Sequence, residues 1–212
     1  MTMSAFDFKI ICVTNRKLCP DDFLERIRQI AHYHPHAILL REKDLMPREY
    51  ERLARSVMEI CEMEHTSCIL HNFTDVAREL RSRALHLPLP LLRATGKSLL
   101  EEFEVLGTSC HSMEEAREAE AMGCSYITLG HIFPTDCKKG LSPRGIPFLR
   151  EICRSVRIPV YAIGGISPQN IAGTVAAGAS GACIMSGLMQ CADIEACMYD
   201  LKRLAAAEES FL

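Results

Sequence analysis

The sequence lacks the two features that direct a chain to a membrane. No uncharged apolar run reaches the roughly 18 residues that a membrane-spanning helix requires. Residues 1–7 contain no basic stretch followed by an apolar segment, so we expect no signal peptide. These absences predict a protein without a membrane partner.

Motifs for metals, redox disulfides and dinucleotides are missing as well. None of the 11 cysteines has C-x-x-C spacing, which excludes a zinc ribbon and a thioredoxin-type motif. Their number is odd, and Cys12, Cys68, Cys153 and Cys183 lie in apolar runs. This indicates reduced, buried thiols and hence a cytoplasmic location. No G-x-G-x-x-G follows the first predicted strand, which argues against a dinucleotide-binding open sheet.

A strong excess of positive charge is absent too. The net charge of −3 argues against a nucleic-acid-binding face, although it leaves room for a local basic pocket. What is present is an ordinary globular composition, with 48% hydrophobic and 24% charged residues. We therefore expect one domain over residues 1–212, large enough to bury a core without metal or disulfide staples.

Short apolar runs alternate along the chain with longer segments of helical spacing. The predicted strands are residues 8–14, 37–40, 67–70, 84–87, 105–109, 126–129, 159–163 and 181–185. The predicted helices are residues 21–33, 47–62, 74–81, 98–103, 112–122, 146–156, 168–177 and 193–207. The strands are continuously apolar, as is typical of parallel strands covered on both faces. Eight such units predict a single TIM (β/α)8 barrel of the α/β class, with an open doubly wound sheet as the alternative.

In a TIM barrel the functional residues follow the carboxyl ends of the strands. Two glycine-containing turns follow the last two predicted strands, Gly164-Gly165 and Met185-Ser186-Gly187. Glycine lets a ligand approach the backbone, and each turn leads into a helix whose first N–H groups attract anions. The turns predict a phosphate site at Gly165, Met185 and Ser186. The alternative is that the Gly-Gly pair merely makes a tight turn.

A long polar loop, residues 130–140, follows the sixth predicted strand, and long loops in compact domains are often functional. His131 comes directly after the strand, and histidine is suited to transfer a proton in either direction. Thr135, Lys138 and Lys139 lie further along the loop, where the lysines are candidates to bind a phosphate or carboxylate. The alternatives are a structural, hydrogen-bonded His131 and solvated lysines.

The run 40–44, Leu-Arg-Glu-Lys-Asp, follows the second predicted strand. Arg41 and Lys43 are two positions apart, so on an extended chain their side chains point to the same side. Both are therefore expected to face the mouth of the barrel as substrate-binding residues. The alternative is a solvated run of charges. Weaker candidates stand at other strand ends, where polar side chains often just cap a loop: Asn72, Ser109 and His111.

Taken in this order, these residues resemble the thiamine phosphate synthase / TenI superfamily. The resemblance covers nearly the whole chain. It is carried by Val13-Thr14, residues 40–44, Asn72 with Asp75-Val76-Ala77, His111 before Glu114-Glu115-Ala116, and residues 130–140, 162–166 and 177–179. The resemblance implies a TIM barrel that acts on a thiazole phosphate.

The synthase branch of this superfamily fits poorly. Synthases join a pyrimidine pyrophosphate to the thiazole phosphate with magnesium, and usually carry one Asp after the Asn of strand three and another after strand four. Here Phe73 follows Asn72, the stretch 86–91 ends in Leu91, and Leu39 replaces a common Gln. Because magnesium demands oxygen ligands, the resemblance predicts no metal site.

The other branch, the thiazole tautomerase TenI, resembles the chain where the synthases do not. Gly130-His131 opens the loop where synthases usually have Gly-Pro, and residues 135–141 and Met185-Ser186-Gly187 match the tautomerase pattern closely. In that branch the loop histidine is the proposed acid/base, a role that carries over to His131. The pair Lys43-Asp44, by contrast, is more similar to the synthases.

We therefore expect an isomerase that aromatises the carboxylated thiazole phosphate of thiamin biosynthesis. A proton moves from the ring carbon bearing the carboxylate to the exocyclic carbon, with His131 as base and acid. Such a shift needs neither a metal nor a redox cofactor. The alternatives are a divergent thiamine phosphate synthase and a regulator that binds thiazole or thiamin phosphate without turnover. A share of His111 in catalysis and a homo-oligomeric state stay open.

Overall fold

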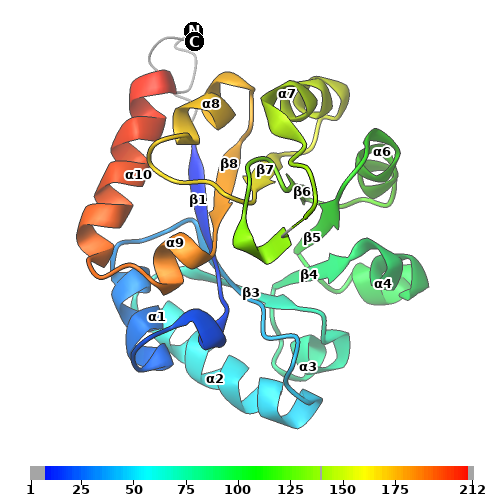
Figure 1. Ribbon diagram of the computed structural model, residues 1–212. Coiled ribbons are helices and arrows are strands. Elements are labelled where there is room, and N and C mark those ends of the chain that lie inside the picture. The colour runs from blue at the N-terminus through cyan, green and yellow to red at the C-terminus, as the bar shows by residue number, and fades with distance from the viewer. Residues whose placement is uncertain (1–7, 139, 210–212) are drawn as a thin grey trace, which may run out of the picture.

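The computed structural model describes residues 8–138 and 140–209, which close into a barrel of eight parallel strands (Figure 1). In chain order the strands are β1 (Lys9–Val13), β2 (Ala37–Leu40), β3 (Ser67–His71), β4 (Ala84–Pro88), β5 (Val105–Cys110), β6 (Tyr126–Gly130), β7 (Val160–Ile163) and β8 (Gly181–Ile184). Each strand pairs with the next along the chain, and β8 closes the barrel on β1, with Cys12 opposite Ile184. The predicted TIM barrel is confirmed, and the open-sheet alternative is wrong.

Helices connect the strands and surround the barrel (Figure 1). They are α1 (Phe23–His32), α2 (Pro47–Met63), α3 (Thr74–Glu79), α4 (Leu89–Ala94), α5 (Lys97–Leu100), α6 (Met113–Ala121), α7 (Gly145–Ser155), α8 (Ile171–Ala176), α9 (Ser186–Met189) and α10 (Ile194–Glu209), with 3-10 turns η1 (Arg16–Leu18) and η2 (Asp136–Lys138). Local signals explain several helix starts. The Asp22 carboxylate caps α1 by accepting from the Glu25 N–H at 2.8 Å, and Pro47 begins α2, where an N–H is not needed.

The prediction was wrong between β4 and β5. The expected helix at residues 98–103 is the short α5, and an unexpected helix, α4, begins directly after β4. Pro88 precedes α4 and Pro90 lies in its first turn, where proline favours a helix instead of breaking it. The sequence also did not reveal α9, which begins immediately after Met185. The predicted strands differ from the observed strands only at their ends.

Side chains fill the barrel interior, so the barrel is a packed core and not a channel. The rings of Tyr126 and Tyr161 meet edge to face, with centroids 5.4 Å apart. A Cβ on Gly107 would overlap the Tyr126 ring, and one on Gly181 would overlap the Tyr161 ring, so packing requires both glycines. The interior cluster consists of Ile11, Val13, Ala37, Leu39, Ile69, Ala84, Tyr126, Tyr161 and Cys183.

Every cysteine of the chain is a free thiol. Cys12 and Cys183 are buried as predicted, whereas Cys68 and Cys153 are partly exposed. The prediction fails for Cys68 because the first residues of β3 are not covered, and burial begins at Ile69. No helix in the described ranges is long and apolar enough to cross a membrane.

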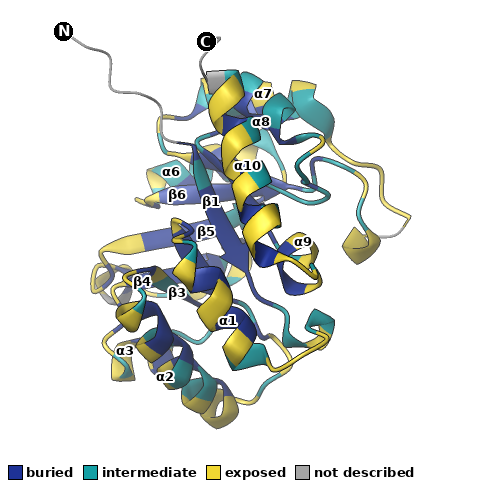
Figure 2. Ribbon diagram, turned by 90° about the vertical axis from the view of Figure 1, so that its left-hand side faces the viewer, coloured by how far each residue is buried: buried dark blue, intermediate teal, exposed yellow. Residues whose placement is uncertain are grey.

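Figure 2 shows the barrel from the side, with buried strands behind helices whose outer faces are exposed. The loop after β6 and helix α9 lie at the same end of the barrel, on the right of this view. This is the end where the strands finish, so the glycine turns after β7 and β8 lie beside the long polar loop.

Candidate active site

A pocket of about 420 Å³ opens at the carboxyl ends of the strands. All predicted site residues except Asn72 line it: Arg41, Lys43, Ser109, His111, His131, Thr135, Lys138, Gly165, Met185 and Ser186. The fold thus gathers side chains from distant parts of the chain, as expected for loops that share one face of a barrel. Their contact with a substrate stays a prediction. Lys139, the other predicted anion ligand of the loop, lies outside the described residues.

Asn72 does not line this pocket, because the chain turns sharply after β3. Its φ of 71° is in the left-handed region, which asparagine tolerates better than most residues. The Phe73 N–H donates to the His71 carbonyl at 2.9 Å, and the Phe73 ring packs on Tyr50 with centroids 4.5 Å apart. The end of β3 therefore presents His71, and not Asn72, to the pocket.

The glycines after β7 are required for a reason that differs from the prediction. Gly164 and Gly165 have φ angles of 98° and 66°, where L side chains are strained. A Cβ on Gly164 would lie 2.8 Å from the His131 Cα, and one on Gly165 would lie 2.9 Å from the Phe133 Cβ. The loop after β6 therefore occupies the space beside these glycines, which was predicted to admit a ligand.

The phosphate prediction rests instead on free backbone donors. In the part of the chain that the structure describes, the N–H groups of Gly165 and Ser186 donate to no acceptor. The Asn170 side-chain amide donates to the Gly165 carbonyl at 2.8 Å and so holds this turn in place. Ser186 begins α9, and the first N–H groups of a helix have no partner within it. Two free donors beside one pocket suit an anion.

Three cations line the pocket, Arg41 and Lys43 after β2 and Lys138 in η2. Within residues 8–138 and 140–209, none of them forms an ion pair with a carboxylate. Burial lowers the pKa of Lys43, and the charges of Arg41 and Lys138 lower it further. The described lining thus carries these three cations against one carboxylate, that of Glu115, and this excess of positive charge suits a ligand with several negative charges.

Glu42 explains why both cations after β2 face the pocket. This carboxylate is 2% exposed and accepts from the Thr14 hydroxyl at 2.7 Å, the Arg16 N–H at 3.0 Å and the Arg16 guanidinium at 3.0 Å. The Thr14 hydroxyl oxygen in turn accepts from the Arg41 N–H at 2.9 Å. Glu42 thus anchors the segment to the end of β1, and its two neighbours, Arg41 and Lys43, are left to line the pocket.

Hydrogen bonds fix the neutral tautomers of His131, after β6, and His111, after β5. His131 Nε2 lies 3.2 Å from the Leu141 carbonyl oxygen, and His111 Nδ1 lies 2.8 Å from the Gly130 carbonyl oxygen. Because a carbonyl oxygen can only accept, these ring nitrogens carry the protons. The lone pair of neutral His131 is therefore on Nδ1, and that of neutral His111 is on Nε2.

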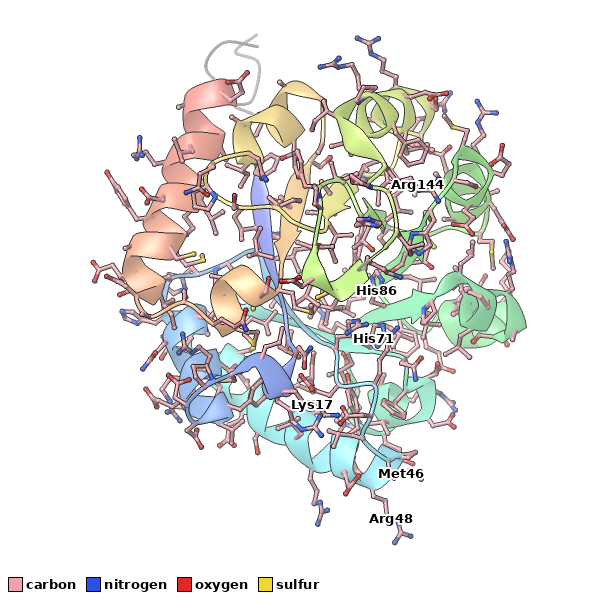
Figure 3. The ribbon with its side chains drawn as sticks, in the orientation of Figure 1. Lys17, Met46, Arg48, His71, His86 and Arg144 are labelled. Atoms are coloured by element: carbon pink, nitrogen blue, oxygen red, sulfur yellow. The ribbon has the colours of Figure 1, made fainter. Side chains whose placement is uncertain are left out.

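Two buried histidines that were not predicted as site residues from the sequence also line the pocket. His71 and His86 are register partners on β3 and β4, and their rings stack with centroids 5.8 Å apart. Figure 3 shows them close together near the middle of the barrel. A sequence signal existed, since each is a lone histidine at or near the end of an apolar strand.

Both of these histidines are neutral at physiological pH. Burial is the main cause that lowers the pKa of His71 to about 2 and that of His86 to about 3. The charges of Arg41 and Lys43 act in the same direction on both rings. His71 and His86 are therefore hydrogen-bonding groups and not acid/base candidates near neutral pH.

His86 organises a chain of hydroxyl groups. Its Nδ1 lies 3.0 Å from the Tyr126 hydroxyl, its Nε2 lies 2.9 Å from the Ser109 hydroxyl, and Thr128 donates to Ser109 at 3.0 Å. Among the described residues the buried Tyr126 hydroxyl has no other acceptor, so it donates to Nδ1, and Nε2–H donates to Ser109. Ser109 then accepts two hydrogen bonds and keeps its own proton for a ligand in the pocket.

The residues do not fit a magnesium site of the synthase kind. Phe73 and Leu91, where synthase ligands are expected, pack against the apolar core. Asp44 is held by Arg16 at 2.7 Å and Lys17 at 2.9 Å, and these hydrogen bonds, that of Arg16 first, hold its pKa far below the usual range. Within the described ranges, no three His, Cys, Asp or Glu side chains gather in a way that could hold a metal ion.

The sequence matches the family model described as thiamine monophosphate synthase over residues 10–188. The chain belongs to this family. The predicted superfamily is thereby confirmed, and with it a place among enzymes of thiamin biosynthesis that bind small phosphate-bearing substrates.

Several members of the thiamine monophosphate synthase family are similar over most of their length. A thiamine-phosphate synthase from Moorella thermoacetica is 36% identical over 187 residues, which cover 85% of this chain and 87% of the relative. One from Syntrophomonas wolfei is 33% identical over 196 residues, which cover 89% and 92%. The solved structure of thiamine phosphate pyrophosphorylase from Pyrococcus furiosus has a TM-score of 0.83 at 27% identity, covering 96% of this chain and 98% of that one.

Proposed function

We propose that this family member is a thiazole tautomerase, an isomerase that aromatises the carboxylated thiazole phosphate. The observation that carries the proposal is the state of His131. This histidine borders the pocket, its Nε2–H is held by the Leu141 carbonyl, and the lone pair on Nδ1 can take a proton. A histidine in this state can act as a base and then return the same proton as an acid.

The charges around the pocket support this substrate, which carries a phosphate at one end and a carboxylate at the other. The N–H groups of Gly165 and Ser186 supply donors for the phosphate. Arg41 and Lys43, which lack carboxylate partners in the described chain, suit the substrate carboxylate. Holding both ends would fix the ring against His131, and such orientation supplies much of the catalysis of a proton shift.

The proposed reaction is a proton shift that changes no oxidation state. The C–H bond at the ring carbon bearing the carboxylate breaks, and its proton moves to Nδ1 of His131. The released electron pair forms a ring double bond, and the electrons of the exocyclic double bond form a new C–H bond with the proton that His131 returns. The cations Arg41 and Lys43 would stabilise the negative charge that develops beside the carboxylate.

The names of the relatives favour a second candidate, a thiamine phosphate synthase. The family resemblance gives that reaction a requirement for magnesium, and Phe73 and Leu91 provide no oxygen ligand where the synthases have one. Asp44, the synthase-like feature of the strand-two segment, is already paired with Arg16 and Lys17. We therefore place the tautomerase first.

One assay of the purified protein distinguishes the two candidates. The carboxylated, non-aromatic thiazole phosphate is supplied alone, or the aromatic thiazole phosphate is supplied with the pyrimidine pyrophosphate, each in EDTA and in millimolar magnesium. A tautomerase aromatises the first substrate at the same rate in both buffers and couples nothing. Magnesium-dependent formation of thiamin phosphate would overturn the proposal in favour of the synthase, and tight binding without turnover would favour a binding protein.

A further inference from the structure

His71 is a buried polar side chain whose ring has no hydrogen-bonding partner among the described residues. It is 4% exposed and lines the pocket, and its backbone N–H donates to the Tyr50 hydroxyl at 2.8 Å. Neither ring nitrogen forms a hydrogen bond with any residue in the ranges 8–138 and 140–209. Buried polar groups almost always have a partner, so two unpaired nitrogens beside a pocket point to a ligand.

Comparison with His86 shows that burial alone does not explain why the ring nitrogens of His71 lack a partner in the described chain. The two rings are stacked register partners, and both are buried. His86, however, has a partner at each nitrogen, the Tyr126 hydroxyl at 3.0 Å and the Ser109 hydroxyl at 2.9 Å. The fold therefore satisfies one histidine of the pair internally and leaves the hydrogen-bonding capacity of the other for the pocket.

The surroundings of His71 indicate the chemistry of the missing partner. Its depressed pKa, about 2, keeps the imidazole neutral, so the ring offers one N–H donor and one lone pair. Arg41 and Lys43 are the charged groups that act on the ring, and both cations line the same pocket. A ligand group in this part of the pocket is drawn there by positive charge, so it is an anion that accepts hydrogen bonds.

The place of His71 in the barrel separates this anion from the phosphate. In the closed strand order, β3 stands opposite β7, on the other side of the mouth from the donor of Gly165. A ligand whose phosphate lies against the turns after β7 and β8 therefore extends its far end towards His71. Figure 3 shows His71 beside His86.

We propose that His71 donates a hydrogen bond to the carboxylate of the substrate and thereby makes the site specific for the carboxylated thiazole phosphate. This inference rests on the proposed tautomerase function and adds the residue that recognises the carboxylate. Arg41 and Lys43 supply charge, which acts over some distance, whereas a neutral N–H acts only along one direction. His71 therefore sets where the carboxylate lies, and with it the ring carbon that loses the proton.

The test measures binding of two stable ligands by calorimetry: the aromatic carboxylated thiazole phosphate, which is the reaction product, and the same molecule without its carboxylate. His71→Phe keeps a ring that can stack on His86 but has no N–H. His71→Gln keeps a side-chain donor. His32→Phe, on the exposed face of α1, is the matched control for the substitution itself.

We expect His71→Phe to weaken binding of the carboxylated ligand about tenfold or more, because a hydrogen bond to a charged group is lost. Binding of the decarboxylated ligand should be unchanged, and His71→Gln should recover part of the loss. In wild-type protein, the imidazole N–H signal of His71 should shift downfield with the carboxylated ligand and not with the other.

Equal weakening of both ligands, or none, would show that His71 is merely structural and would overturn this inference while leaving the tautomerase intact. An unmoved His71 signal with the carboxylated ligand bound would do the same without any variant. If the wild-type protein binds neither thiazole phosphate, the proposed function fails, and the role of His71 fails with it.

Discussion

His111 and Gly130 are joined by a hydrogen bond of 2.8 Å from the ring Nδ1 to the backbone carbonyl oxygen. Gly130 is the last residue of β6 and shares its peptide bond with His131. The side chain of His111 thus holds the peptide on which the proposed base is mounted. The two histidines line one pocket, and we propose different tasks for them: His131 transfers the proton, and His111 sets the position of His131.

Replacing the proposed base should abolish most of the rate. His131→Asn keeps a polar side chain of comparable bulk but cannot take and return a proton. We expect kcat for aromatisation to fall by roughly 10²–10⁴, the usual contribution of a positioned acid/base. The KM should change little, because the phosphate donors and the cations are untouched.

His111→Asn is the control for this experiment and should lose less activity, since it alters the position of His131 and not the proton transfer. Steady-state kinetics of both variants decide the matter. A near-normal kcat in the His131 variant, with a large loss in the His111 variant, would move the base to His111.

Glu42, which anchors the segment that carries Arg41 and Lys43, should be needed for the stability of the fold. Glu42→Gln removes the buried charge that faces the Arg16 guanidinium, and we expect a loss of about 2 kcal/mol in the free energy of unfolding. Asp44→Asn breaks the solvent-exposed ion pair of the same Arg16 and should cost distinctly less. Urea denaturation measures both. Equal losses would mean that Glu42 is not the anchor.

Acid should destabilise the fold through the two buried histidines. The pKa values of His71 and His86, about 2 and about 3 in the folded protein, lie below the usual histidine value of 6.5. Below pH 6.5 the unfolded chain therefore binds more protons than the folded chain, and stability falls as the pH falls towards about 3. Each histidine should cost about 2 kcal/mol between pH 7 and pH 5.

His71→Phe removes one of these titrating groups, so urea denaturation at pH 7 and pH 5 should show a smaller difference for this variant than for wild type. The exposed His32→Phe serves as the control and should keep the full difference. A His71 variant with the same acid sensitivity as wild type would contradict the depressed pKa.

The turn after β7 packs closely on the loop after β6, and we expect no room for a methyl group added at Gly164. In Gly164→Ala the new Cβ would meet the His131 Cα at 2.8 Å, at a φ of 98° that alanine rarely adopts. We expect a loss of stability of about 1–3 kcal/mol and a large fall in kcat, because His131 must shift. Gly96→Ala, with no atom within 4 Å of its Cβ, should leave stability and rate nearly unchanged. Thermal unfolding and kinetics of the pair test this contact.

The sequence by itself determined the barrel and most of the pocket. The barrel follows from alternating apolar runs and helical segments, because parallel strands covered on both faces must be apolar throughout. Candidates such as Arg41, Lys43, His131 and Ser186 could be chosen because, in this architecture, the segments that follow the strands gather at the same face.

Only the tertiary structure decided which of these residues meet. Continuous apolar strands carry no alternation, so the sequence could not show that His71 and His86 turn inward and stack, whereas Asn72 turns away. Nor could it show that Gly164 and Gly165 make room for the loop after β6, because the loop residues that they meet, His131 and Phe133, lie more than thirty residues earlier in the chain. Both outcomes depend on the closure of the barrel and on the register of its strands, which bring together side chains that no local sequence pattern connects.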